Sequence, residues 1–324
     1  MRLRTRAAGV IGIAVALAGL LTLTGARLAA PQGTRLVALE TTAKVPVQEP
    51  FDPFWNDIPR VEVPLSAQQV TPPMGGHRWT LWARAIHDSE NVYVMAEWDD
   101  PRPNRSTSAT QDFTDSVALE FPAVASETVP ALCMGDPAAN VNIWQWKAAY
   151  QEQIHRGYEG IKGRYPNTAV DWYPFHGEKT FYPGRATGNP VSSNARTSAV
   201  DNLIAAGFGT LTPDPDSTVT GWGAWRDGRW RVVFQRPMMA SGEGNVNLPV
   251  DARTSMAFAV WDGGAQERDG MKSVGNFVSL DVSSKAMPAP VQFPYWPAPY
   301  FVVLAVFALL VWLVIARGSK EAGE

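Results

Sequence analysis

The sequence predicts a mainly β protein whose central part folds as an antiparallel β-sandwich. Short runs rich in Val, Phe, Trp and Thr recur between residues 61 and 282, and turn-forming residues separate them. The runs do not alternate with helical segments, so a parallel sheet with crossover helices is not expected. Only the two terminal segments carry a convincing helical pattern. Many short strands joined by turns are typical of a sandwich.

The strands are expected to pair as hairpins. The clearest signal covers residues 79–99, where turn residues at 88–91 separate two runs of strand-forming residues. Asp227 and Gly228 separate two further runs between 221 and 237, and Asp-Gly is a strong hairpin signal. Pro64 cannot donate to a ladder, which predicts an edge strand at 61–65. The remaining expected strands cover 115–121, 141–146, 254–262 and 275–282.

The chain divides into one folded domain and flanking segments. The domain is expected at 50–285, between an extended linker at 31–49 and a Pro-rich linker at 286–299. Residues 1–30 combine arginines, an apolar run and small residues. This pattern predicts either a cleaved signal peptide or an uncleaved signal anchor, and both remain open.

The segment at 300–316 predicts a transmembrane helix. It holds no charged residue, and as a helix it is roughly 25 Å long, close to the thickness of the hydrocarbon core. Arg317 and Lys320 follow it, and the N-terminus is also basic, so the tail at 317–324 is expected in the cytoplasm. The domain at 50–285 is then expected on the outer, periplasmic side of the cell membrane.

Composition and motifs exclude several functions. The net charge is −3 and charged residues make up 18%, so no nucleic-acid-binding surface is expected. Cys133 is the single cysteine, which excludes an internal disulfide, covalent c-type haem and the cysteine clusters of iron–sulfur or structural zinc sites. No nucleophile or acid/base motif is present, so the chain is not expected to be an enzyme by itself. Asp99 and Asp100 end a strand and are expected in solvent, and His87 is expected on the surface.

Two residues stand out on local grounds. Met134 lies in the turn Cys-Met-Gly-Asp-Pro, where a loop can present its sulfur, although a buried loop methionine is the simpler interpretation. Lys272 lies near the end of a Gly-rich loop at 262–273, where a solvated lysine is the simpler interpretation. A lysine that coordinates a metal does so through its neutral amine. The residues alone leave both interpretations open for each position.

Four segments follow one another in a specific order: DSVALEF (115–121), CMGDPAANVNIWQWKA (133–148), GWGAWRDGRWRVVFQRPM (221–238) and AVWDGGAQERDGMKSVGNFVSL (259–280). Together they resemble the haem-binding gamma subunits of the ethylbenzene dehydrogenase type. Relatives of that family occur in dimethylsulfide dehydrogenase, selenate reductase and chlorate reductase. The resemblance extends over most of residues 50–285 and implies a β-sandwich that holds one b-type haem without covalent attachment.

The resemblance also implies the haem ligands. In that family a methionine and a lysine bind the iron axially, and the matching residues here are Met134 and Lys272. Met271 and Lys147 are the nearest alternatives. Two axial protein ligands leave no open position on the iron, which is typical of electron transfer and not of oxygen or substrate binding.

Tryptophans carry both a structural expectation and a second functional hypothesis. Trp144 and Trp146 are candidate walls of the haem pocket, and ordinary core packing is the alternative for each. Thirteen tryptophans are also compatible with sugar-stacking platforms. The alternative function is therefore a surface-anchored carbohydrate-binding module without a cofactor. A membrane-anchored scaffold that has lost its haem is a third hypothesis.

The function that the resemblance implies is a membrane-anchored b-type cytochrome subunit. Such a subunit transfers electrons between a molybdenum oxidoreductase and the respiratory chain. The expected partners are a molybdenum-cofactor catalytic subunit, an iron–sulfur subunit, and either the quinone pool or a membrane cytochrome. Familiar members of the family are soluble exported subunits, whereas this chain carries the apolar segment at 300–316. That difference implies a complex tethered to the outer face of the membrane.

Overall fold

The computed structural model describes residues 34–124, 130, 132, 134–158, 163–169, 187, 196–214 and 217–288. The predicted segments at 1–30, 300–316 and 317–324 lie outside these residues, as do Cys133 and most of the predicted linker at 286–299. Within the described ranges, no helix is both long and apolar enough to cross a bilayer. All described strands belong to a compact unit that ends at Ala286.

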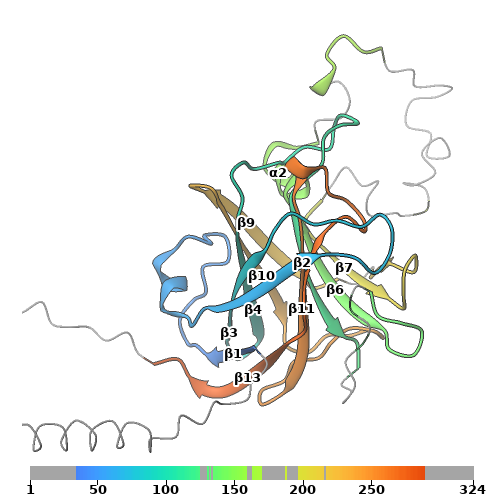
Figure 1. Ribbon diagram of the computed structural model, residues 1–324. Coiled ribbons are helices and arrows are strands. Elements are labelled where there is room, and N and C mark those ends of the chain that lie inside the picture. Colours follow the sequence, from blue (N-terminus) through green and yellow to red (C-terminus); the bar gives the residue numbers. More distant parts are fainter. Residues whose placement is uncertain are drawn as a thin grey trace, which may run out of the picture. The chain divides into compact units, whose positions relative to one another are not determined.

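This unit is a β-sandwich (Figure 1). One sheet has the order β9-β10-β4-β3, and the other has the order β8-β7-β6-β5-β11. All strand pairs are antiparallel except the two that β1 makes. The strands are β1 (Arg35–Glu40), β2 (Val61–Ala67), β3 (Thr80–His87), β4 (Asn91–Asp99), β5 (Ser116–Pro122), β6 (Val141–Lys147), β7 (Val200–Ala205), β8 (Thr212–Pro213), β9 (Thr220–Arg226), β10 (Arg229–Pro237), β11 (Arg253–Trp261), β12 (Ser273–Gly275) and β13 (Val278–Ala286). The helical elements among these residues are η1 (Pro53–Asp57), α2 (Ala148–Arg156) and η4 (Gly263–Ala265).

The two sheets are joined along one side by strands that pair with both. Residues 61–64 of β2 pair with β3, and residues 65–67 pair with β12, which pairs in turn with β11. In the same way β13 pairs with β11 and β1, and β1 reaches β3. Residues 61–64 pair with β3 alone among the described strands, as predicted for an edge strand that contains Pro64, but β2 does not end there and continues into the second sheet.

The predicted mainly β, antiparallel class is confirmed. The predicted hairpins are β3–β4 and β9–β10, and the second turns at Asp227 and Gly228, which both have positive φ as the Asp-Gly signal requires. Elements that lie where the sequence predicted none include β1 inside the expected linker at 31–49, β7, and the helix α2. The apolar residues of β1 are buried against β13, so this segment belongs to the sandwich.

Tryptophans join the two sheets inside the sandwich. Trp146 of β6 contacts Trp98 of β4 and Trp230 of β10, with ring centroids 6.5 and 5.0 Å apart. Their exposed fractions are 0, 0 and 2%. Such aromatic pairs contribute about 0.5–1.5 kcal/mol beyond the area that they bury. The centre of the sandwich is thus filled by its own side chains.

We expect Gly223→Ala to destabilise the sandwich, because Gly223 of β9 lies directly against Trp146. A side-chain carbon at this position would come within 2.3 Å of Trp146 Cζ2. Overpacking of this kind costs about 1–3 kcal/mol of unfolding free energy. Urea denaturation measures the change, and the exposed Thr220→Ala on the same strand is the control, with an expected change within about 0.5 kcal/mol. Equal stability of the two variants would contradict this packing.

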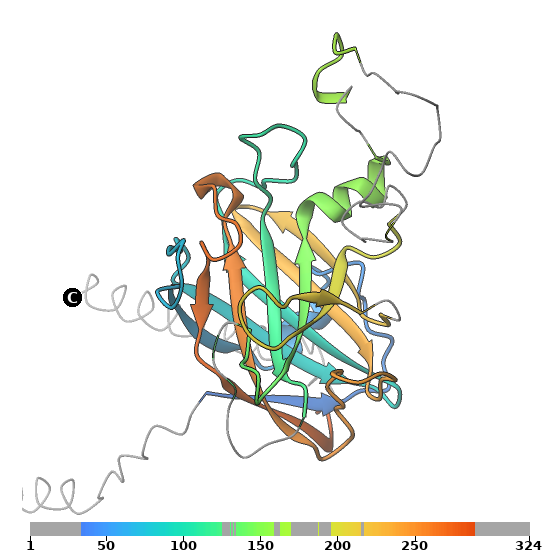
Figure 2. The ribbon, with the colours of Figure 1, turned by 90° about the vertical axis from the view of Figure 1, so that its right-hand side faces the viewer.

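Loops from both sheets gather at the end of the sandwich that carries α2. Figures 1 and 2 both show the segments before β5 and after β11 at that end. The pairing agrees, because Ser116 at the start of β5 pairs with Lys147 at the end of β6 and with Trp261 at the end of β11. Residues far apart in the sequence are therefore brought together there.

Candidate cofactor-binding site

A cavity of about 600 Å³ lies on the outer face of the sheet that contains β5, β6, β7 and β11. Its volume is in the range of small-molecule and cofactor sites. Segments at 68–73, 107–114, 208–211 and 267–272, with residues 132 and 134, complete its wall. Apolar side chains on the sheet face line it, among them Ala118, Ile143, Leu203, Trp261 and Val274.

Alternation along β6 decides which side chains reach the cavity. Ile143 and Lys147 line it, whereas Trp144 and Trp146 point to the other face and are fully buried in the sandwich core. The expectation that Trp144 and Trp146 wall the cofactor pocket is therefore wrong for this cavity. Trp261 of β11 lines it instead.

Met134 lines the cavity, and hydrogen bonds from the surrounding chain fix both its backbone N–H and its carbonyl. Its N–H donates to Glu120 Oε2 at 2.9 Å, and its carbonyl accepts from the Gly207 N–H at 2.8 Å. The φ of Met134 is 99°, a region that is costly for residues other than glycine. Backbone conformations of this kind persist only where neighbouring contacts enforce them, and they cluster at ligand sites.

Lys272 lines the same cavity and is 8% exposed. Its Nζ lies 5.1 Å from the ring centroid of Trp261, whose own N–H donates to the Asp269 carbonyl at 3.1 Å. Among the residues that the structure describes, no carboxylate or other acceptor is within bonding distance of the amine. A buried ammonium without an acceptor is costly. The amine of Lys272 is thus free to bind a group in the cavity.

A neighbouring loop fixes the backbone of Lys272. The Lys272 N–H donates to the Gly75 carbonyl at 3.1 Å, and its carbonyl accepts from the Gln68 N–H at 3.0 Å. The side-chain amide of Gln68 also donates to the Gly270 carbonyl at 2.8 Å. A side chain at Gly76 would come within 2.5 Å of the Lys272 carbonyl oxygen, so glycine permits this close approach.

The contacts of the alternative ligands differ from those of Met134 and Lys272. Lys147 also lines the cavity, but its Nζ lies 3.1 Å from Asp201 Oδ2 and 3.2 Å from the Tyr150 hydroxyl. Met271 is not among the lining residues. These contacts favour Lys272 over Lys147 as a ligand, because only Lys147 already has a carboxylate partner.

Met134 and Lys272 reach the cavity from different ends of the sheet. Met134 is bonded to Glu120, whereas Lys272 lies over Trp261, which pairs with Ser116 at the start of β5. Glu120 and Ser116 are four residues apart on one strand, roughly 13 Å. A thioether and an amine that approach a flat ligand from opposite sides require separated attachment points of this kind.

The three histidines that the structure describes do not line the cavity. His77 lies outside it, with Nδ1 2.6 Å from Glu267 Oε1 and its side chain 58% exposed. His155 is exposed. The prediction that His87 is a surface residue is wrong, because it is fully buried and contacts two backbone carbonyls. His176 lies outside the described residues.

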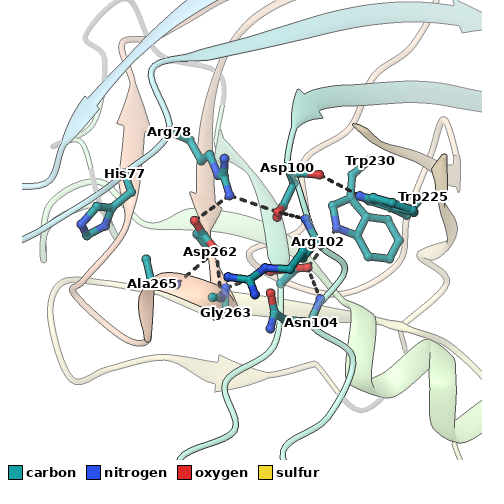
Figure 3. Close-up of polar contacts among 12 residues, drawn as sticks. His77, Arg78, Asp100, Arg102, Asn104, Trp225, Trp230, Asp262, Gly263 and Ala265 are labelled. Atoms are coloured by element: carbon teal, nitrogen blue, oxygen red, sulfur yellow. Dashed lines mark hydrogen bonds and ion pairs between the residues drawn. The ribbon is translucent and has the colours of Figure 1, made fainter. Parts of the chain in front are cut away.

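Three buried aspartates form a cluster beside the cavity wall (Figure 3). Burial, together with repulsion from Asp262, raises the pKa of Asp100 to about 6. Burial and repulsion from Asp100 raise the pKa of Asp115 to about 7. The prediction that Asp99 and Asp100 are both in solvent is wrong for Asp100, which is 1% exposed, because only Asp99 points outward.

The lining fits a flat, largely apolar metal cofactor such as haem. The sheet face supplies apolar contacts, and the surrounding loops supply one thioether and one amine without an acceptor. Arg268 is an exposed residue of the cavity wall, and its guanidinium lies 4.9 Å from the Phe113 ring centroid. It makes no ion pair in the described part of the chain. It is a suitable partner for a carboxylate at the edge of such a cofactor.

Several residues of the site were not identified from the sequence. Glu120, Gln68 and Trp261 act through contacts between segments far apart in the chain, which no local pattern reveals. One signal was available for the loop that fixes Lys272. The Gly75-Gly76 pair is a usual mark of a close backbone approach.

Comparison with known proteins gives a consistent set of similarities. Residues 52–273 match the family model described as ethylbenzene dehydrogenase. A protein of Haloferax mediterranei named as a respiratory nitrate reductase heme subunit is 25% identical over 97% of both chains. The chlorate reductase subunit gamma of Ideonella dechloratans is 28% identical, over 82% of this chain and 92% of its own length. The dimethylsulfide dehydrogenase subunit gamma of Rhodovulum sulfidophilum is 26% identical, over 75% of this chain and 78% of its own length.

Proposed function

The chain belongs to the ethylbenzene dehydrogenase family, and from this premise we propose that it is the haem-binding, electron-transfer subunit of an oxidoreductase complex. Relatives that match most of its length are named as heme or gamma subunits of reductases and a dehydrogenase. The chain itself is therefore not the catalytic subunit. The proposed cofactor is one b-type haem, held without covalent attachment.

One observation carries this proposal. Met134 and Lys272, selected from the sequence as axial ligands, line one cavity, and Lys272 is buried there without an acceptor. A haem held by the thioether of Met134 and the amine of Lys272 would supply one-electron transfer. The thioether of Met134 is a soft ligand that favours the reduced metal.

The chain's own residues orient these ligands. Glu120 and Gly207 hold the backbone of Met134, so its side chain extends from a fixed turn. The loop at 68–76 holds the backbone of Lys272, and Trp261 covers the amine. Fixed ligands reduce the reorganisation that accompanies electron transfer. Arg268 is the proposed partner of a haem propionate.

The proposed cellular setting rests on the terminal segments. The apolar residues at 300–316 would anchor the protein in the cell membrane, with the sandwich on the outer face. The proposed partners are a molybdenum-cofactor catalytic subunit and an iron–sulfur subunit on one side. On the other side, the quinone pool or a membrane cytochrome would exchange electrons with the complex.

The carbohydrate-binding alternative is less well supported. Sugar-stacking platforms require exposed aromatic faces, but Trp55, Trp98, Trp144 and Trp146 are fully buried. Among the described tryptophans, Trp79 is the one with a largely exposed side chain. The similarity to heme and gamma subunits also favours the electron-transfer role.

We expect the purified full chain to contain b-type haem. The measurement is the visible spectrum in detergent solution, followed by conversion to the pyridine haemochrome, which identifies the haem type and gives its ratio to protein. The expected ratio is about one haem per chain, because one cavity holds the ligand pair. Well-folded protein without haem, prepared from cells supplied with a haem precursor, would contradict the proposal.

A further inference from the structure

The aspartate cluster is built from three separate segments of the chain. Asp100 follows β4, Asp115 precedes β5 and Asp262 follows β11, so the fold itself brings them together. One ligand atom from each lies within 4.8 Å of the others, and the residues are 1, 0 and 8% exposed. Buried carboxylates require a positive partner or a complete set of donors.

Two of the three carboxylates have such donors. Asp115 accepts from the N–H groups of Asn104 at 2.6 Å, Gly263 at 2.9 Å and the Trp230 indole at 3.0 Å. The Asp262 carboxylate caps η4 through the Gly264 and Ala265 N–H groups. These oxygens are oriented by the chain, which is the usual role of hydrogen bonds around metal ligands.

Asp100 is different because one of its oxygens has no partner. Its Oδ1 accepts from the Arg102 N–H and from Arg78, both at 3.1 Å. Its Oδ2 is buried and has no hydrogen-bond donor among the described residues. The neighbouring carboxyl is that of Asp115, whose two oxygens already accept from Asn104, Gly263 and Trp230. An unpartnered carboxylate oxygen at this position indicates a missing positive group.

The charges in the cluster also indicate a missing positive group. Arg78 Nη2 lies 2.6 Å from Asp262 and 3.1 Å from Asp100, as Figure 3 shows. This guanidinium contacts two of the three carboxylates, and Asp115 makes no ion pair among the described residues. The side-chain oxygens of Asn104 and Asp262 both lie beside Gly264, 3.2 and 3.1 Å from the point where a side chain at that residue would begin.

We infer that Asp100, Asp115 and Asp262 bind a divalent cation of the calcium class. Such cations take six to eight oxygen ligands, largely from carboxylates, carbonyls and water. A divalent ion would add positive charge to the cluster and supply the missing partner of Asp100 Oδ2. It would tie the segment that follows Asp262, which leads to the loop carrying Lys272, to the ends of β4 and β5.

The test uses the full chain in detergent, treated with a chelator and then titrated with Ca²⁺, Mg²⁺ or Tb³⁺. We expect saturable binding of one ion, a rise of the melting temperature with Ca²⁺, and Tb³⁺ luminescence on excitation of tryptophan, because Trp230 is bonded to Asp115. Ca²⁺ is expected to displace Tb³⁺. The titration is made on haem-free protein, so that this inference and the proposed function can fail separately.

The decisive variant is Asp100→Asn, compared with Asp99→Asn on the adjacent exposed residue. Asparagine keeps the acceptor for Arg102 and Arg78 but removes the charge, so Ca²⁺ binding is expected to weaken by about tenfold or more. The cation-free Asp100→Asn protein is expected to melt no lower than the cation-free wild type, because a repulsive charge is gone. Asp99→Asn should bind as the wild type does. Absence of saturable binding, or equal binding by Asp100→Asn, would overturn the inference and assign a shared proton to Asp100 and Asp115.

Discussion

Replacement of Lys272 by alanine is expected to abolish stable haem binding. Among the described residues that line the cavity, Lys272 is the cation that is buried without an acceptor, and alanine offers no ligand in its place. The haem-to-protein ratio after size-exclusion chromatography should fall several-fold, and any haem that remains should show an altered visible spectrum. Absorption spectra at equal protein concentration measure both effects.

Two comparisons separate ligand loss from unfolding. Lys147→Ala removes the other lysine of the cavity, which is paired with Asp201, and should keep the haem spectrum. The haem-free Lys272→Ala protein should melt at or above the temperature of the haem-free wild type, because a buried ammonium without an acceptor is removed. An unaltered haem spectrum in Lys272→Ala, with loss in Lys147→Ala, would reassign the ligand.

The fold was predictable where the local pattern and the final environment agree. β3, β4, β9 and β10 combine strand-forming residues with turn residues, and no later contact changes their pairing. β2 was placed on an edge because Pro64 cannot donate to a ladder. Residues 61–64 do pair with β3 alone, but residues 65–67 continue into the other sheet, and this crossing depends on packing that a single strand cannot reveal.

Helix α2 shows a further limit of local patterns. It continues directly from β6, so the alternating run up to Lys147 passes into a helix without a Gly or Pro between them. Its Gln151 side chain accepts from the Trp146 indole at 2.8 Å and bonds to the backbone of Gly223. These contacts between strands and helix fix where α2 begins, and they exist only in the folded protein.

The sequence singled out two residues that line the cavity, but not the face of the sheet on which the cavity lies. Met134 and Lys272 stood out because a turn methionine and a lysine of a Gly-rich loop match an ordered set of motifs. Trp144 and Trp146 were expected at the pocket because they lie in the same segment, 133–148, as Met134. The strand period of two sends them into the sandwich core, while Ile143 and Lys147 face the cavity. Which face of a sheet binds a ligand depends on the loops that cover it, and those loops come from distant parts of the chain.

Replacement of Met134 by histidine is expected to keep the haem and lower its midpoint potential. Imidazole favours the oxidised iron more than a thioether does, so the potential should fall by roughly 100 mV or more, within the range of about 0.8 V that axial ligands span. Histidine also tolerates positive φ better than most residues, which suits the φ of 99° at this position. Redox titration followed by visible spectroscopy measures the midpoint.

The matched control is Met271→His, because Met271 lies next to Lys272 in the sequence but does not line the cavity. Its midpoint and spectrum should equal those of the wild type. A variant with Met134→His that shows an unchanged midpoint and spectrum would mean that Met134 is not an axial ligand. A midpoint potential that falls in Met134→His but not in Met271→His would assign Met134 as a ligand. Haem loss in Lys272→Ala would assign Lys272 independently, because that variant removes a donor atom whereas Met134→His exchanges one.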